Sequence, residues 1–183
     1  MKPINEKEIA LLVQDPERQR EAFGKIVDAY SEQLYWQIRC MVLSHDDAND
    51  ILQNTFLKAW SNLEYFRGEA RLQTWLYRIA MNECLTFLNK QQTAANISID
   101  DEQAAAARLL ESDAYFDGNE AQRLFQKAIH TLPEKQRMVF NLKYFQEMKY
   151  EDISEILGTS IGALKASYHH AVKKIEDFLN QNN

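Results

Sequence analysis

The stretch Tyr150–Ile175 restricts the fold more than any other part of the chain, because it is patterned as two helices with one sharp corner between them. In its first half Ile153 and Ile156 recur at helical spacing. Gly158 is the residue type that most readily ends a helix in the left-handed conformation, and Ser160 can cap the helix that follows. The stretch therefore predicts a helix–corner–helix unit.

The second helix of this unit has two chemically different sides, given a rotation of about 100° per residue. One side gathers larger apolar residues: Ile161, Leu164, Tyr168, Ala171, Val172 and Ile175. The other side begins with small residues and continues with cationic or titratable ones: Gly162, Ala163, Ala166, His169, His170, Lys173 and Lys174. This order is typical of a recognition helix that offers its first turns to base edges in the major groove. A surface helix of an ordinary bundle has a similar pattern, and this stretch by itself leaves both interpretations open.

The remainder of the chain is predicted to be all-α. Only 5 glycines and 3 prolines occur in 183 residues, so long segments run without a helix breaker. Apolar periodicity predicts helices over residues 6–13, 18–43, 46–63, 71–90 and 119–131, and again from 134 up to the corner unit. The apolar periodicity fails over residues 91–118. We therefore predict two small helical domains, residues 1–91 and 119–183, joined by an acidic linker, residues 92–118.

Charge and hydropathy exclude several classes of protein. The net charge of −6 argues against a protein that coats nucleic acid indiscriminately, so any DNA contact must be local or assisted by a more basic partner. No apolar run approaches the roughly 20 residues of a membrane span, and the N-terminal residues lack the apolar centre of a signal peptide. We expect a cytoplasmic protein with no membrane span of its own.

Cysteines and histidines give no sign of a metal site or a catalytic centre. Cys40 and Cys84 are far apart without partner spacing, which favours buried free thiols over a disulfide. The four histidines show no metal-ligand spacing, and no glycine-rich phosphate loop occurs. We expect no metal, no cofactor and no enzymatic activity.

The predicted helix 46–63 has a solvent-facing side that is suited to docking on a partner protein. Opposite its apolar stripe lie Asp50, Gln53, Asn54 and Leu57. A leucine ringed by a carboxylate and amides can pack on a partner helix. A single exposed leucine is usually without function, so the pattern alone does not decide.

A second candidate surface follows. The loop after this helix carries Tyr65, Phe66 and Arg67, and one side of the next helix carries Arg71, Thr74, Trp75, Arg78 and Asn82. Bases stack on aromatic rings with about 1–3 kcal/mol each while arginines follow the phosphates, which suits single-stranded nucleic acid. Aromatic residues at helical spacing are also common in cores. Glu83 falls on the inward side of this helix, and the sequence gives no physical reason for its position there.

Three segments, taken in order, resemble one known family. They are DDANDILQNTFLKAW at Asp46–Trp60, YFRGEARLQTWLYRIAMN at Tyr65–Asn82, and LPEKQRMVFNLKYFQEMKYEDISEILGTSIGALKASYHHAVKKI at Leu132–Ile175. Together they are similar to the extracytoplasmic-function (ECF) sigma factors, the minimal members of the sigma-70 family. The resemblance implies that the first domain, region 2, binds the clamp helices of core RNA polymerase and melts the promoter −10 element. It implies that the last domain, region 4, binds the −35 element and the polymerase flap.

By position, the resemblance assigns roles to individual residues. Polymerase docking falls to Asp50, Gln53, Asn54 and Leu57. Capture of the melted −10 strand falls to Tyr65, Phe66, Arg67, Arg71, Thr74, Trp75, Arg78 and Asn82. Contacts to the −35 element fall to Lys165, Ala166, His169 and His170 at base edges, with Ser167, Lys173 and Lys174 on phosphates. The chain departs from the family at Ser167, His170 and Val172, where arginines are common, so fewer fixed charges predict a shallower salt dependence.

The resulting hypothesis is a sigma factor that directs promoter-specific initiation, with core RNA polymerase, promoter DNA and an anti-sigma factor as partners. The alternative is a stand-alone helix-turn-helix regulator, which would bind duplex DNA specifically by itself. The sequence does not reveal the promoter sequence, the regulon or the inducing signal.

Overall fold

The computed structural model describes residues 6–42, 44–66, 71–95 and 120–182. These residues are almost entirely helical and include no strand, as the all-α prediction requires. Most of the predicted linker, together with Arg67, lies outside the described residues.

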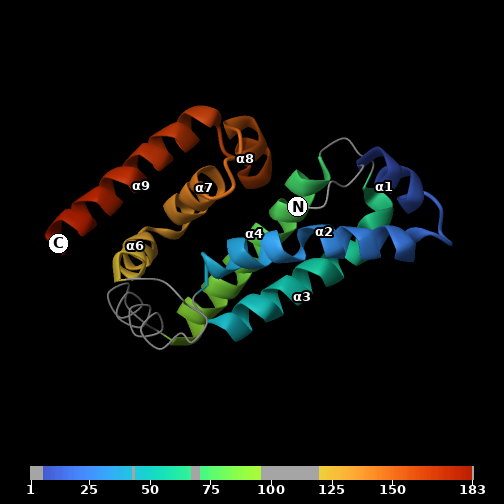
Figure 1. Cartoon of the computed structure of the whole chain (residues 1–183), viewed down its shortest axis with the longest axis horizontal. Coiled ribbons are helices and arrows are strands. Elements are labelled where there is room, and N and C mark those ends of the chain that lie inside the picture. The colour runs from blue at the N-terminus through green and yellow to red at the C-terminus, as the bar shows by residue number, and fades with distance from the viewer. Residues whose placement is uncertain (1–5, 43, 67–70, 96–119, 183) are drawn as a thin grey trace.

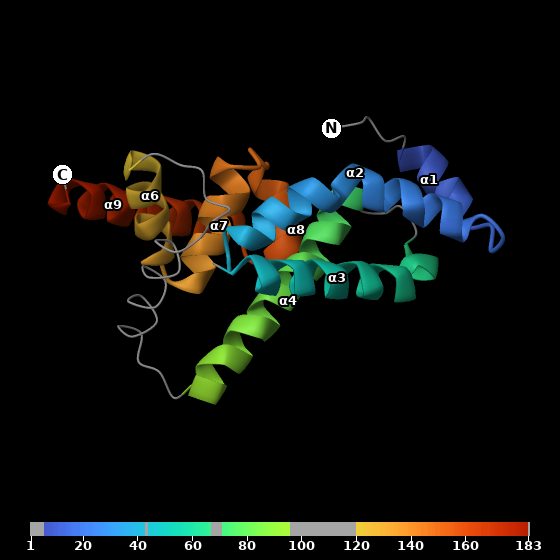
Figure 2. The ribbon, with the colours of Figure 1, turned by 60° about the horizontal axis from the view of Figure 1, so that its bottom comes forward.

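The helices form an N-terminal and a C-terminal group (Figure 1). The N-terminal group is α1 (Glu6–Val13), α2 (Gln19–Arg39), α3 (His45–Ser61), the short 3₁₀ turn η1 (Leu63–Tyr65) and α4 (Leu72–Ala95). The C-terminal group is α6 (Glu120–His130), α7 (Glu134–Tyr144), α8 (Tyr150–Leu157) and α9 (Ile161–Gln181). In both views of the ribbon, α2 and α3 run side by side and α4 crosses them (Figures 1 and 2).

Helix α3 begins earlier than its sequence suggests. Asp46 or Asp47 would be an acceptable cap, but the structure uses Ser44, whose Oγ accepts a hydrogen bond from the Asp47 backbone N–H at 3.2 Å. The two aspartates then lie in the first turn, where the helix dipole favours negative charge.

The corner between α8 and α9 has the predicted chemistry. Gly158 adopts the left-handed conformation at φ 62° and ψ 31°, and its N–H donates to the Ser154 carbonyl at 2.9 Å. The Ser160 side chain accepts from the Ala163 N–H and caps α9. Helix α9 continues to Gln181, so the second helix of the unit is longer than predicted.

The side chains of α9 divide as the helical wheel predicts. Leu164, Ala171 and Ile175 are buried, whereas the small and cationic side is exposed. On the inner side Phe140 of α7 stacks between Tyr144 and Tyr168, with ring centroids 5.0 and 5.8 Å away. This aromatic packing holds α9 against α7.

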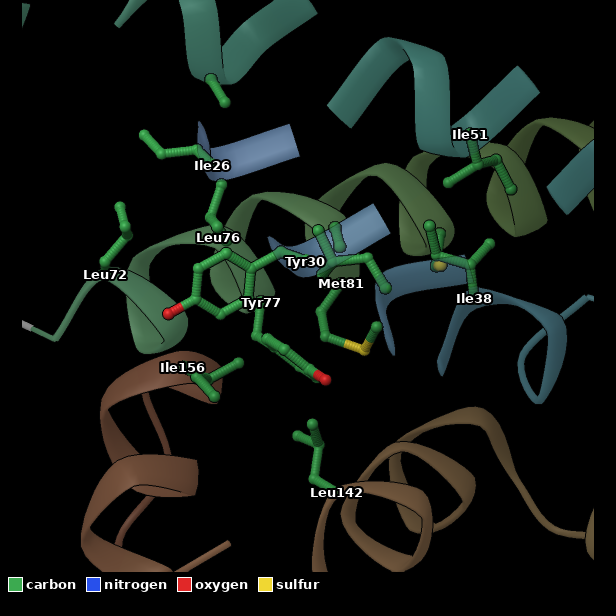
Figure 3. Close-up of a cluster of buried hydrophobic side chains, with 14 of the residues drawn as sticks. Ile26, Tyr30, Ile38, Ile51, Leu72, Leu76, Tyr77, Met81, Leu142 and Ile156 are labelled. Atoms are coloured by element: carbon green, nitrogen blue, oxygen red, sulfur yellow. The ribbon is translucent and has the colours of Figure 1, made fainter. Parts of the chain in front are cut away.

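The two helix groups share one hydrophobic core, which the sequence does not predict. Leu142 of α7 and Ile156 of α8 are buried in the same cluster as Tyr77 and Leu76 of α4 (Figure 3). A second, smaller cluster around Phe140 and Ile129 belongs to the C-terminal group alone. The structure thus places α8 directly against α4.

We expect Gly158→Ala to lower the free energy of unfolding by about 1 kcal/mol or more, because alanine is strained at positive φ. Gly162→Ala is the matched control in the neighbouring helix, where a Cβ would meet no atom within 4 Å. This control should stabilise by about 0.5–1 kcal/mol. Urea unfolding of both variants provides the measurement, and equal shifts of the same sign would contradict the assigned corner.

Candidate nucleic-acid and partner surfaces

Helix α3 presents the four predicted docking residues on its solvent side. Asp50, Gln53, Asn54 and Leu57 are all exposed, and 64% of Leu57 is accessible. The cause is the opposite stripe, in which Ala48, Ile51, Thr55 and Ala59 are buried. An exposed leucine framed by polar groups thus projects from a helix that is anchored along its other side.

The docking face has an apolar extension that the sequence analysis missed. Trp60, one turn after Leu57, is 42% exposed while its ring meets Phe23 of α2 edge-on at 5.1 Å. The spacing of Leu57 and Trp60, three residues apart, was the available signal. Tryptophan at helical spacing usually belongs to a core, so the sequence alone does not assign Trp60 to the surface.

The aromatic residues after α3 have different environments. Tyr65 is 67% exposed, whereas Phe66 is buried and lies 5.2 Å from the partly buried Trp75 ring. A hydrogen bond with Glu64 raises the pKa of the Tyr65 phenol. In this arrangement Tyr65 offers its ring to solvent, and Phe66 packs against Trp75.

The predicted capture side of α4 is only partly on the surface. Arg71, Arg78 and Asn82 are exposed, while Thr74 is 3% exposed. The Thr74 hydroxyl therefore does not face a strand approaching from solvent in this arrangement. A helical wheel places Thr74 on the outward side because a wheel contains no information about neighbouring helices. In the structure, helices pack on more than one side of α4.

Arg78 contacts the C-terminal helices. Its Nε donates to the backbone carbonyl of Glu155 in α8 at 3.0 Å, and its Nη2 donates to the same oxygen. The Nη2 atom also lies 3.8 Å from the Glu155 carboxylate. A residue predicted to bind nucleic acid is thus engaged by α8.

Glu83 obtains a partner only in the folded chain. Its carboxylate, in a side chain that is 11% exposed, pairs with the ammonium of Lys58 on α3. The two residues are 25 positions apart, so no local pattern connects them. This ion pair joins α3, which carries the predicted docking residues, to α4, which carries most of the predicted capture residues.

Helix α9 exposes its predicted recognition residues. Lys165, Ala166, His169, His170, Lys173 and Lys174 are exposed, and Ser167 is partly buried. The Lys165 ammonium lies 5.8 Å from the centre of the ring of Tyr150, the first residue of α8. The rings of His169 and His170 are 6.0 Å apart and tilted by 55°, so they point in different directions.

The buried thiols have the state that the sequence predicts. Both cysteines are free; Cys84 is buried, and Cys40 is partly buried. Burial raises the pKa of Cys40 to about 11 and that of Cys84 to about 12, so both stay protonated near neutral pH. In the part of the chain that the structure describes, no three potential ligands gather as a metal site would require. No helix among the same residues has the length and apolar character to span a membrane.

Comparison with known proteins identifies the family. Residues 26–94 match the profile described as Sigma-70 region 2, and residues 122–175 match that of Sigma-70, region 4. The ECF RNA polymerase sigma-E factor of Haemophilus influenzae is 30% identical over 176 residues, covering 92% of this chain and 93% of the relative. The ECF RNA polymerase sigma factor SigW of Bacillus subtilis is 32% identical over 160 residues, covering 82% and 84%.

Solved structures share the fold. CnrH in complex with the cytosolic domain of CnrY superposes with a TM-score of 0.72 at 21% identity, over 97% of this chain and 99% of that one. The sigma factor RpoE of Bartonella quintana, in complex with the anti-sigma factor NepR, gives 0.68 at 24% identity over 88% and 98%. This chain belongs to the ECF sigma factors of the sigma-70 family.

Tyr65 and Phe66 are adjacent, but truncation should change stability by very different amounts at the two positions. We expect Phe66→Ala to lower the free energy of unfolding by about 3 kcal/mol or more, because it removes a buried ring and leaves a cavity beside Trp75. Tyr65→Ala should change stability by no more than about 0.5 kcal/mol, since the side chain is exposed. Thermal and urea unfolding measure both; a large loss in Tyr65→Ala would show that its ring is structural.

Proposed function

We propose that this sigma factor docks on the clamp helices of core RNA polymerase through Asp50, Gln53, Asn54 and Leu57 of α3. The observation that carries the proposal is that all four residues are exposed on one side of a helix whose other side is buried. Leu57 supplies the apolar anchor, and the carboxylate and amides around it supply the polar rim of a helix-to-helix contact.

The second proposed task is capture of the unpaired −10 strand. Tyr65 offers a stacking surface, and Arg71, Arg78 and Asn82 offer charge and hydrogen bonds along α4. Unstacking a base costs a few kcal/mol, and one aromatic ring returns about 1–3 kcal/mol, so melting is the trapping of bases that open transiently. Phe66, Trp75 and Thr74 are proposed to shape this site from beneath, and Arg67 completes the family motif.

The third proposed task is duplex recognition by region 4. Lys165, Ala166, His169 and His170 would face base edges of the −35 element, and Ser167, Lys173 and Lys174 would face phosphates. Short side chains at the start of α9 allow the helix to approach the groove closely. The flap of the polymerase is the proposed protein contact of this domain.

The charge of the chain agrees with dependence on a larger enzyme. A protein with net charge −6 and a small cationic face gains little from counterion release on free DNA. Core polymerase would supply most phosphate contacts and all covalent chemistry, so we propose no enzymatic activity and no cofactor for this chain. The site of action is the cytoplasm, where promoter DNA and polymerase meet.

An anti-sigma factor is a further proposed partner. The structural neighbour RpoE is described in complex with the anti-sigma factor NepR. In this chain, the exposed side of α3 is a surface that such a regulator would cover to block docking. A stand-alone regulator, the alternative, is not favoured, because both sigma-70 regions are present in order.

The decisive experiment is in vitro transcription with core RNA polymerase and this protein on a library of genomic fragments. Transcripts that depend on the added protein support the proposal, and their start sites identify the promoter elements. Failure to bind core, or binding without any start site, refutes it.

We expect Leu57→Asp to weaken binding to core polymerase by at least about tenfold, because it removes the apolar anchor and places a charge in the contact. Leu11→Asp is the matched control, since Leu11 is also highly exposed, at 70%, but lies on α1 outside region 2. Affinity measurements on labelled protein test the pair. Normal binding by the Leu57→Asp variant would show that this side of α3 is not part of the docking site.

We expect His170→Glu to lower transcription from promoters with an intact −35 element by roughly tenfold, through repulsion from the DNA. Initiation from templates with a scrambled −35 element should change little. Asn180→Glu, at an exposed position further along α9, is the control. Run-off transcription gives the ratio; equal losses on both templates would contradict a role for His170 in −35 recognition.

A further inference from the structure

Helix α4 differs in charge from the acidic chain to which it belongs. The chain has 27 acidic and 21 basic residues, which give a net charge of −6. Among the 24 residues of α4 the single carboxylate is that of Glu83, whose side chain is 11% exposed and paired with Lys58. Exposed carboxylates repel phosphate groups, so the solvent-facing side of α4 is well suited to follow a nucleic-acid backbone.

A row of exposed side chains continues along α4 beyond the residues proposed to capture the −10 strand. Arg78 and Asn82 are exposed members of that proposed site. Thr86 and Lys90 follow at the same spacing of four residues, and both are exposed as well. Residues four apart lie on one side of a helix, so the row runs on without a break. The proposed −10 site therefore covers only part of a longer polar surface.

The far end of this row carries groups that bind phosphate. The Lys90 ammonium pairs with no carboxylate among the described residues. The neighbouring Asn89 is exposed, and its side-chain amide has two N–H donors. Thr86 is less available, because its hydroxyl donates to the Asn82 carbonyl of the same helix at 2.8 Å. Asn89 and Lys90 are therefore the two residues of this segment with donors directed to solvent.

The position of these two residues leaves room for a duplex. The C-terminal half of α4 projects away from α2 and α3 (Figure 2). Neither of those helices therefore blocks a DNA backbone that approaches Asn89 and Lys90 from solvent.

The order of the regions along the chain indicates which DNA reaches this end of α4. The chain continues from α4 into region 4, which is proposed to bind the −35 element upstream of the −10 element. Lys90 lies eight residues after Asn82, which is about 12 Å along a helix that rises 1.5 Å per residue. Successive base pairs are about 3.4 Å apart, so Lys90 lies about three to four base pairs upstream of a base held at Asn82.

We propose that Asn89 and Lys90 of α4 bind the phosphate backbone of the duplex DNA directly upstream of the −10 element. This inference rests on the proposed function and adds a contact to it. The contact has no base specificity, because phosphates carry no sequence information. It holds the DNA at the boundary where the paired duplex ends and the captured single strand begins.

Two promoter fragments separate this contact from capture of the single strand. The first is a single-stranded −10 oligonucleotide. The second is the same single strand joined to an upstream duplex that ends before the −35 element, so region 4 has no site on it. Affinities of both fragments are measured for core polymerase loaded with this protein, and the wild-type complex should bind the second fragment more tightly.

Asn89→Glu and Gln91→Glu form a matched pair, because each adds one carboxylate at an exposed position of α4. Gln91 lies two residues after Asn89, about 200° further round the helix and therefore away from the row. We expect Asn89→Glu to weaken binding of the duplex-containing fragment by about three- to tenfold through repulsion from phosphate. Its binding to the single-stranded fragment should stay within about twofold of the wild type, and Gln91→Glu should bind both fragments normally.

Lys90→Ala gives an independent measurement of the same contact. Loss of one phosphate contact should make the dependence of log affinity on log salt concentration shallower by about 0.9 for the duplex-containing fragment. The salt dependence for the single-stranded fragment should not change.

Three results would overturn the duplex contact: no loss for Asn89→Glu and Lys90→Ala on either fragment, equal losses on both fragments, or equal losses for Asn89→Glu and Gln91→Glu. Equal losses on both fragments would place the two residues in single-strand capture instead. Failure of the wild-type complex to form, or to bind the single-stranded fragment, is a different result and refutes the proposed function together with this addition to it.

Discussion

The burial of α4 on more than one side is the constraint on which the rest of the structure depends. Helices α2 and α3 pack on it from the N-terminal group, and α8 packs on it from the C-terminal group. Leu76, Tyr77, Ala80 and Cys84 are consequently fully buried. Only a strip of α4 remains for solvent, and this strip carries the arginines and the amide proposed to hold an unpaired strand. The groups of region 2 that are available to nucleic acid are therefore those that helix packing leaves exposed.

The proposed docking and capture surfaces are on two helices, α3 and α4, that pack against each other. Packing between α3 and α4 is reinforced by the Lys58–Glu83 pair, in which the glutamate is mostly buried. Because one end is exposed, the pair itself contributes little free energy, and its effect is chiefly to fix register.

In the C-terminal group, aromatic packing fixes the position of α9. Its recognition helix is held from behind by stacked aromatic rings, with Phe140 between Tyr144 and Tyr168. Burial of His130 lowers its pKa well below the ordinary value, and its Nδ1 lies 2.7 Å from the Arg137 guanidinium, so the α6–α7 corner keeps a neutral imidazole. The outer side of α9, which includes Lys165 and His170, is thus left exposed, whereas Ser167 is partly buried.

Local patterns determined most of the helices, the Gly158–Ser160 corner, the sidedness of α3 and α9 and the exposure of the docking residues. These features depend on periodicity and on the conformational preferences of single residues, both of which act over a few positions. Only the tertiary structure decided that Phe66 and Thr74 are buried, that Glu83 pairs with Lys58 and that α8 covers part of α4 and engages Arg78. Each of these depends on contacts between residues distant in the chain, and a helical wheel carries no information about which neighbour covers which side.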